Sequence, residues 1–277
     1  MAYRTLVNTG QLEKHLSSWR LFDCRHDLGK PQLGEQQYRE AHIPGALFAH
    51  LDRDLSALKT GANGRHPLPD RGAFIAWLGQ QGLKPGDQVV CYDGGSGAMA
   101  ARLWWMLRWV GHEAVAVLDG GLAKWLQEGR PTTPEVPRFA HSSYPVRPPA
   151  ARAVDVNALE SRTEELLLLD ARAPARFRGE QEPIDPIAGR IPGAKNRFSN
   201  DNLGAQGIFK KPQLLRNEFR AVLGDRAPEE VVSYCGSGVA ACHNLLAMEL
   251  AGLRGGRLYA GSWSEWIADP ARPREKG

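Results

Sequence analysis

The sequence carries one set of four landmarks twice, in the same order along its 277 residues. Each set contains an apolar run ending in Asp-x-Arg, an Ile-Pro-Gly-Ala motif and a Val-Val-x-Tyr run before a glycine-rich loop. The fourth landmark is a glycine with a tryptophan five residues after it. The matched ranges are 21–25 with 168–172, 42–46 with 190–194, 89–92 with 231–234, and 119–125 with 259–266. Such ordered matches indicate an internal duplication. The chain is therefore expected to fold as two similar domains, which suits its length.

A proline-rich stretch separates the two copies. Residues 131–150 contain prolines at positions 131, 134, 137, 145, 148 and 149, and proline interrupts both helices and central strands. We therefore predict a first domain over residues 1–130, a linker over residues 131–150, and a second domain over residues 151–277.

Within each copy, short apolar runs alternate with stretches of helical spacing. In the second copy, residues 165–170, 231–234 and 257–259 are predicted strands, and residues 212–220 form a predicted helix with one apolar face. The alternation predicts an α/β fold in which each domain is a mainly parallel sheet covered by helices. Ligands of such sheets bind at the carboxyl ends of the strands.

Charge and composition argue against several classes of function. The net charge is +4 and the basic residues are scattered, so no nucleic-acid partner is expected. The sequence has no run of about 20 apolar residues for a membrane span and no apolar signal core near its start, so the expected location is the cytoplasm. The four cysteines have neither a Cys-x-x-Cys pair nor metal-ligand spacing. This argues against a disulfide framework or a structural zinc site. No metal or organic cofactor is expected.

The strongest chemical signal is a cysteine that follows the apolar run 231–234. Cys235 opens a Gly-Ser-Gly loop, and a helix rich in Ala, Leu and Met comes directly after it. Backbone N–H groups of such a loop, together with a helix N-terminus, favour an anion and therefore a thiolate. The first copy has Asp93 at the matching position. We expect Cys235 to be a nucleophile and Asp93 to have a structural or electrostatic role rather than a catalytic one.

The Cys235 loop allows three other interpretations. Cys235 could be an inert buried cysteine, or the chain could be a non-catalytic binding module. A cysteine phosphatase would need an arginine six residues after the cysteine to clamp the phosphoryl group, and that position is Ala241. The intact thiol loop favours an enzyme, and the missing arginine disfavours a phosphatase.

Several separated motifs together resemble one enzyme family. The loop Cys-Gly-Ser-Gly-Val at 235–239, both Ile-Pro-Gly-Ala motifs and the Gly-Ser-Trp-Ser-Glu-Trp run at 261–266 are similar to those of two-domain rhodanese-family sulfurtransferases. The resemblance implies tandem rhodanese-like domains, a Cys235 persulfide and no cofactor. It also implies a small anionic sulfur donor, 3-mercaptopyruvate or thiosulfate, and cyanide or a thiol as acceptor.

The same resemblance implies further site residues. Arg176 matches the family arginine that binds the anionic group of the donor. The loop residues Gly236, Gly238, Val239 and Ala240 are expected to line the donor site.

A proton relay is also implied by the resemblance. Ser237 matches the loop serine assigned to proton transfer in 3-mercaptopyruvate enzymes, and His66 and Asp52 of the first copy match its partners.

The sequence departs from the family pattern where a second donor-binding arginine is expected, because Asp185 stands there. A second clamp is therefore missing or supplied by Arg190, Lys195 or Arg197. The catalytic loop itself has no cation to attract the double charge of thiosulfate, so 3-mercaptopyruvate is the favoured donor.

Overall fold

The computed structural model describes residues 2–161 and 165–277, which form two compact units. Unit 1 comprises residues 1–57, 69–150 and 205–209. Unit 2 comprises residues 58–68, 151–204 and 210–277. Each unit therefore includes a short segment from the other copy of the repeat. The segment 58–68 matters for the site, because it belongs to the same unit as Cys235.

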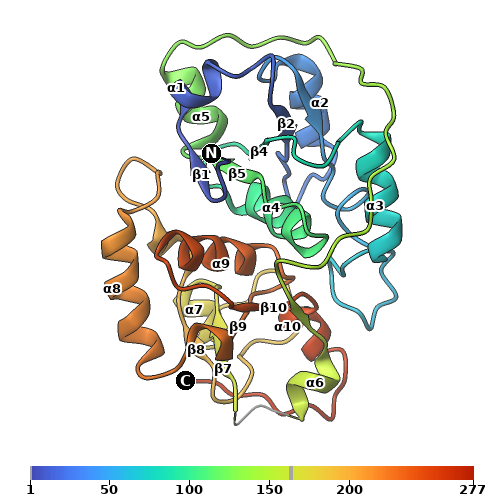
Figure 1. Cartoon of the computed structure of the whole chain (residues 1–277). Helices are drawn as coiled ribbons and strands as arrows, with labels where there is room; N and C mark the ends of the chain where they lie inside the picture. The colour runs from blue at the N-terminus through green and yellow to red at the C-terminus, as the bar shows by residue number, and fades with distance from the viewer. Residues whose placement is uncertain (1, 162–164) are drawn as a thin grey trace. The chain divides into compact units, whose positions relative to one another are not determined.

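In unit 1, the described residues form a parallel sheet of five strands, in the order β1-β5-β4-β2-β3 (Figure 1). The strands are β1 (Leu6–Val7), β2 (Arg20–Asp23), β3 (Ala46–Phe48), β4 (Val89–Tyr92) and β5 (Val115–Leu118). The helices are α1 (Thr9–Glu13), α2 (Leu33–Glu40), α3 (Arg71–Gln80), α4 (Ala98–Trp109) and α5 (Gly121–Gln127).

In unit 2, the described residues form a second parallel sheet with the equivalent order, β6-β10-β9-β7-β8. The strands are β6 (Ala153–Val154), β7 (Leu167–Asp170), β8 (Lys195–Asn196), β9 (Val231–Tyr234) and β10 (Arg257–Tyr259). The helices are α6 (Val156–Glu160), α7 (Pro174–Phe177), α8 (Pro212–Leu223), α9 (Ala240–Leu250) and α10 (Ser262–Trp266), with 3-10 turns η1 (Ser199–Asn202) and η2 (Pro228–Glu230). The predicted fold class is confirmed.

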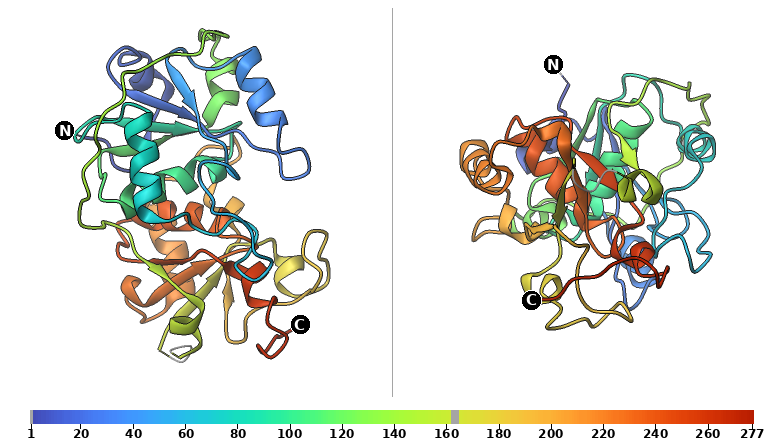
Figure 2. Two further views of the ribbon diagram at one scale, coloured as in Figure 1. Left: turned by 90° about the vertical axis from the view of Figure 1, so that its right-hand side faces the viewer. Right: turned by 90° about the horizontal axis from the view of Figure 1, so that it is seen from below.

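Alternation along the central strands explains why helices cover both faces of each sheet (Figure 2). In β4, Val90 and Tyr92 belong to a core that also contains Leu12 of α1 and Trp125 of α5. The intervening Val89 and Cys91 are equally buried, and they lie on the opposite face, because neighbouring residues of a strand point to opposite sides. Strands buried on both faces read as continuous apolar runs, as the sequence does here.

The proline-rich stretch 131–150 lies against unit 1. The Ser142 N–H donates to the Gly79 carbonyl in α3 (2.8 Å), and the Ala150 N–H donates to the Arg108 carbonyl in α4 (2.8 Å). A Cβ on Gly79 would come within 2.4 Å of the Ser142 carbonyl oxygen, so only glycine allows this close approach. The stretch is thus an irregular segment that is bonded to its own unit at several points.

Candidate active site

Cys235 lies directly after β9, at the carboxyl edge of the unit 2 sheet. Its Sγ accepts the backbone N–H groups of Gly238 (3.1 Å) and Ser237 (3.5 Å), and only 3% of the residue is exposed. Helix α9 begins at Ala240, so Val239 is its N-cap residue. Converging N–H groups and the positive end of a helix stabilise negative charge on the sulfur. The loop is therefore built to hold a thiolate or a persulfide.

The start of α10 fixes the catalytic loop from the other side. The Cys235 N–H donates to Ser262 Oγ (3.1 Å), and the Ser262 hydroxyl donates to the Tyr259 carbonyl (2.9 Å). Among the described residues, Ser262 alone combines a side chain with a positive φ, +55°. Such backbone strain persists where its surroundings hold it in place. The equivalent residue of the first repeat is Gly121, which has the same φ of +55° without strain. A serine stands at this position in the second repeat because its hydroxyl anchors Cys235.

Ser237 and His66 are in contact, as the sequence predicts. His66 Nδ1 and Ser237 Oγ share a 2.8 Å hydrogen bond, and both residues are about 95% buried. The backbone N–H of the preceding residue, Arg65, donates to Ser264 Oγ of α10 (3.0 Å), which holds the 58–68 segment beside the catalytic loop. A hydroxyl and an imidazole thus lie next to the nucleophile.

Two guanidinium groups lie over the catalytic loop. A Cβ on Gly236 would be 3.5 Å from Nη2 of Arg176 and 2.7 Å from Nη2 of Arg65. Arg176 donates to Glu182 (2.6 Å) and to Asp185 (3.1 Å), and Arg65 donates to the other oxygen of Asp185. The loop therefore has a cationic side, although its own residues are uncharged.

Comparison with known proteins decides the family. The sequence matches the Rhodanese-like domain family over residues 8–128 and 155–269. It is 48% identical, over the whole of both chains, to the probable 3-mercaptopyruvate sulfurtransferase of Pseudomonas aeruginosa. It is 36% identical to the putative thiosulfate sulfurtransferase SseB of Mycobacterium tuberculosis, with 93% of this chain and 90% of the other covered.

The chain belongs to the rhodanese family. A solved structure, the 3-mercaptopyruvate sulfurtransferase from Leishmania major, superposes with a TM-score of 0.83 at 30% identity, covering 98% of this chain and 75% of that one. The reaction class predicted from the sequence, a sulfurtransferase, is confirmed by these relatives and by the shared fold.

Arg65 is the site residue that sequence reasoning missed in this sulfurtransferase. Burial lowers the pKa of its guanidinium and the negative charge of Cys235 opposes that shift, which places the two groups within electrostatic reach. Arginine stays protonated in either case. The available signal was a cation directly before His66, in a segment already expected to reach the site.

The three residues that could have supplied a second clamp each bind other groups, which favours the alternative that the expected second clamp is missing. Arg190 binds Glu275 and the Gly277 carbonyl. Arg197 donates to Asn202 (3.0 Å) and Glu218 (2.6 Å). Lys195 donates to the Val222 carbonyl (2.7 Å). Each of the three satisfies a structural carboxylate, amide or carbonyl group.

Asp52 belongs to unit 1, where its carboxylate lies 3.8 Å from Nε2 of His26. With His50 these side chains form the single group of metal-ligand type among the described residues, within 4.8 Å of one another. However, His50 Nδ1 accepts the backbone N–H groups of Asp52 (3.1 Å) and Arg53 (3.3 Å). A neutral imidazole that accepts at Nδ1 carries its proton on Nε2, so His50 has no lone pair left for a metal. The relay role of Asp52 stays a prediction.

In the first repeat, the carboxylate of Asp93 occupies the centre of the equivalent loop. Asp93 accepts backbone N–H groups from Gly95, Gly97 and Met99 (each 2.9 Å) and from Ala100 (3.3 Å). One of these donors, the Gly95 N–H, aligns with the Ser237 N–H that serves the sulfur in unit 2. The first repeat therefore keeps the anion cradle and fills it internally.

We expect Asp93→Ala to lower the free energy of unfolding by about 1–3 kcal/mol, because four backbone donors, two of them buried, lose their acceptor. Asp93→Asn, which keeps one oxygen, should lose less. Urea unfolding measures the loss of stability in both variants, and steady-state turnover is measured on the same samples. A large fall in turnover at unchanged stability would contradict a structural role for Asp93.

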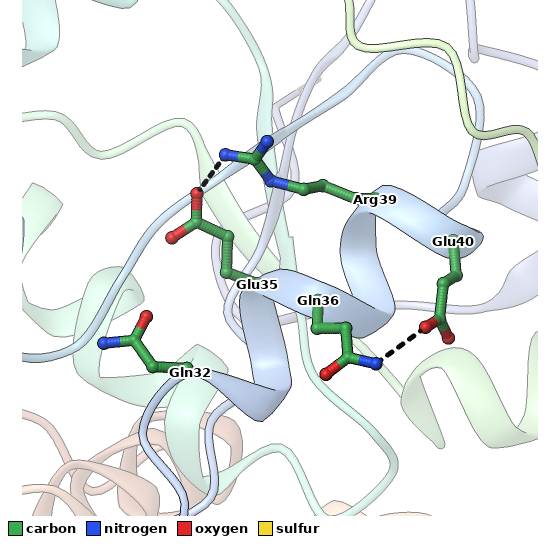
Figure 3. A pocket seen from close by; sticks show the side chains of 5 residues that line it. All are labelled: Gln32, Glu35, Gln36, Arg39 and Glu40. Atoms are coloured by element: carbon green, nitrogen blue, oxygen red, sulfur yellow. Dashed lines mark hydrogen bonds and ion pairs between the residues drawn. The ribbon is translucent and has the colours of Figure 1, made fainter.

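A hollow of about 420 Å³ along α2 is not a competing site. Figure 3 shows two pairs among its lining side chains: Arg39 donates to Glu35 (2.8 Å), and Gln36 donates to Glu40 (3.0 Å). These are ordinary contacts between residues four apart on an exposed helix. None of the lining residues is a nucleophile.

Proposed function

We propose that this sulfurtransferase takes sulfur from 3-mercaptopyruvate and passes it, through a persulfide on Cys235, to cyanide or a thiol. The thiolate attacks the sulfur of the donor, and the carbon–sulfur bond breaks. Its electron pair passes to the enolate of pyruvate, which then takes up a proton. In the second half, the acceptor attacks the outer sulfur and the sulfur–sulfur bond breaks. Cys235 thereby regains its thiolate.

The observation that carries this proposal is the Ser237–His66 hydrogen bond beside Cys235. Loss of sulfur from 3-mercaptopyruvate leaves an enolate that must be protonated, and an imidazole linked to a hydroxyl suits that step. Thiosulfate leaves as sulfite, which needs no such proton. A buried proton-transfer pair therefore favours 3-mercaptopyruvate.

The same groups explain how the donor would be held. Arg65 and Arg176 flank Gly236, and a guanidinium group matches the geometry of a carboxylate. With the carboxylate at this pair, the sulfur of the donor would reach the cradle formed by the N–H groups of Ser237 and Gly238. These groups then stabilise charge as it develops.

Thiosulfate remains the second candidate donor because the cationic side of the loop is larger than the sequence suggested. The expectation that the loop lacks a cation overlooked Arg65, whose guanidinium can donate hydrogen bonds to thiosulfate as well as to a carboxylate. A relative is also named as a putative thiosulfate sulfurtransferase.

Steady-state rates with each donor, and cyanide as acceptor, separate the two candidates. We expect kcat/KM to be higher for 3-mercaptopyruvate, and Ser237→Lys to shift the preference towards thiosulfate by adding a cation at the loop. A wild-type kcat/KM that favours thiosulfate by about tenfold, or about 1.4 kcal/mol, would contradict the proposed donor.

The cytoplasm is the proposed location. All four cysteines of the chain are free thiols, which suits a reducing compartment. Of the helices described, none has the length and apolar character needed to cross a membrane. Small molecules are the proposed partners: the donor and the thiol or cyanide acceptor.

A further inference from the structure

Asp185 is a buried carboxylate shared between the two guanidinium groups at the catalytic loop. Its side chain is 2% exposed, and one oxygen binds Arg65 while the other accepts from Nη2 of Arg176 (3.1 Å). The backbone N–H of Asp185 donates to Glu182 (3.0 Å), which fixes the carboxylate in turn. The same oxygen that binds Arg176 would be 3.6 Å from a Cβ on Gly236. A negative charge therefore lies about as close to the loop as the guanidinium of Arg176 does (3.5 Å).

Both arginines keep donors for a ligand. Nη2 of Arg65 and Nη1 of Arg176 make no hydrogen bond to the part of the chain that the structure describes, and the two side chains are 26% and 16% exposed. Each guanidinium thus uses one side to bind carboxylates and presents the other. Asp185 holds both guanidinium groups in this arrangement, although Arg65 is 120 residues away from it in the sequence.

The charges of this cluster balance. Its cations are Arg65, Arg172 and Arg176, and its anions are Asp170, Glu182 and Asp185, all joined by ion pairs. Three positive and three negative groups leave no net charge to attract a second negative charge on a ligand. A ligand with a single carboxylate can still bind through directed hydrogen bonds to the arginines. The second negative charge of a dianion is repelled by the nearby carboxylate of Asp185.

We propose that Asp185 is a positioning residue that sets the donor preference of this enzyme. It holds Arg65 and Arg176 at the catalytic loop and keeps the local charge low, so that a donor with one carboxylate is preferred to a dianion. This inference rests on the proposed function for its choice of donors. It assigns a role to the residue that stands where a second arginine is expected.

A charge series at this cluster tests the inference through the ratio of kcat/KM for thiosulfate to that for 3-mercaptopyruvate. Asp185→Asn keeps the shape and raises the local charge by one, so the ratio should rise about tenfold. Arg65→Gln lowers the local charge by one, so the ratio should fall. Asp185→Glu restores the charge and should return the ratio towards the wild-type value. The increase should come mainly from KM for thiosulfate and should shrink at high salt.

Asp225→Asn serves as the matched control, because it makes the same change in net charge at an exposed residue outside the cluster. A ratio that does not follow the order Arg65→Gln, wild type, Asp185→Asn overturns the inference. So does an equal shift in the Asp225→Asn control. If Asp185→Asn does not fold, Arg65→Gln should still lower the ratio while Asp185→Glu leaves it near the wild-type value, and a ratio that Arg65→Gln does not lower overturns the inference.

Binding to an inactive protein separates this inference from the proposed function. In a Cys235→Ser background, calorimetry should show tighter binding of thiosulfate when Asp185→Asn is added. Unchanged binding would contradict the role of Asp185 even if the wild-type enzyme uses 3-mercaptopyruvate. Conversely, tighter binding would support that role even if wild-type turnover with 3-mercaptopyruvate failed.

Discussion

Replacing Cys235 with serine is expected to abolish turnover with either donor, a loss of at least about 1,000-fold. Cys235 Sγ is the atom on which the N–H groups of Ser237 and Gly238 converge. A serine hydroxyl fits the same cradle but cannot carry a sulfane sulfur. The fold should be unchanged, because the backbone N–H of residue 235 still finds Ser262 Oγ. Steady-state assays with both donors, together with circular dichroism, measure the two effects.

Cys91→Ser is the matched control. Cys91 is a buried cysteine of β4, and the aligned residue of the second repeat, Ser233, is already a serine. The control should keep turnover near that of the unchanged protein. Substantial activity in the Cys235→Ser variant would mean that another group is the nucleophile.

Gly238→Ala is expected to damage both the fold and the catalysis. Gly238 has φ +76°, and a Cβ there would lie 2.4 Å from the carbonyl oxygen of Ala260. Because the obstacle is backbone, the catalytic loop and the end of β10 must separate. The Gly238 N–H would then leave the sulfur of Cys235. We expect unfolding to become easier by about 2–4 kcal/mol and kcat/KM to fall by about 100-fold or more.

Gly193→Ala separates backbone strain from steric contact. Gly193 has a similar φ of +72°, but a Cβ there would meet nothing within 4 Å. The Gly193→Ala substitution should lower the free energy of unfolding by about 1–2 kcal/mol, because alanine disfavours the left-handed conformation. It should leave kcat nearly unchanged. Urea unfolding and turnover of the two variants make the comparison. Equal losses in both variants would show that the contact with Ala260 does not matter.

The duplication could be predicted because its signals are local. Apolar runs, turns and glycine loops recur in order, and each is specified by a few neighbouring residues. Residues 231–234 and 257–259 were predicted as strands and correspond to β9 and β10. The helix predicted at 212–220 extends to Leu223, where Gly224 ends it at φ +62°. Boundaries of this kind depend on the terminal residues more than on the apolar pattern.

The cationic side of the site could not be predicted in the same way. The sequence shows Asp185 where an arginine is expected, which suggests a weakened clamp. The structure brings Arg65 to that carboxylate from 120 residues away, through a segment that joins the opposite unit. Such an exchange depends on tertiary packing, and no local pattern encodes it. Ser237 and His66 were paired correctly because the family resemblance supplied the long-range contact.

The central claim is that sulfur passes through Cys235, and peptide mass spectrometry after a single exposure to 3-mercaptopyruvate tests it most directly. With no acceptor present, the peptide that contains Cys235 should gain one sulfur, about 32 Da, and lose it when cyanide is added. The peptides of Cys24, Cys91 and Cys242 should remain unmodified, since Cys24 and Cys91 belong to unit 1 and the Cys242 thiol is bound to the Gly238 carbonyl (3.2 Å). A sulfur adduct on any of those three cysteines that cyanide removes, with none on Cys235, would contradict the account.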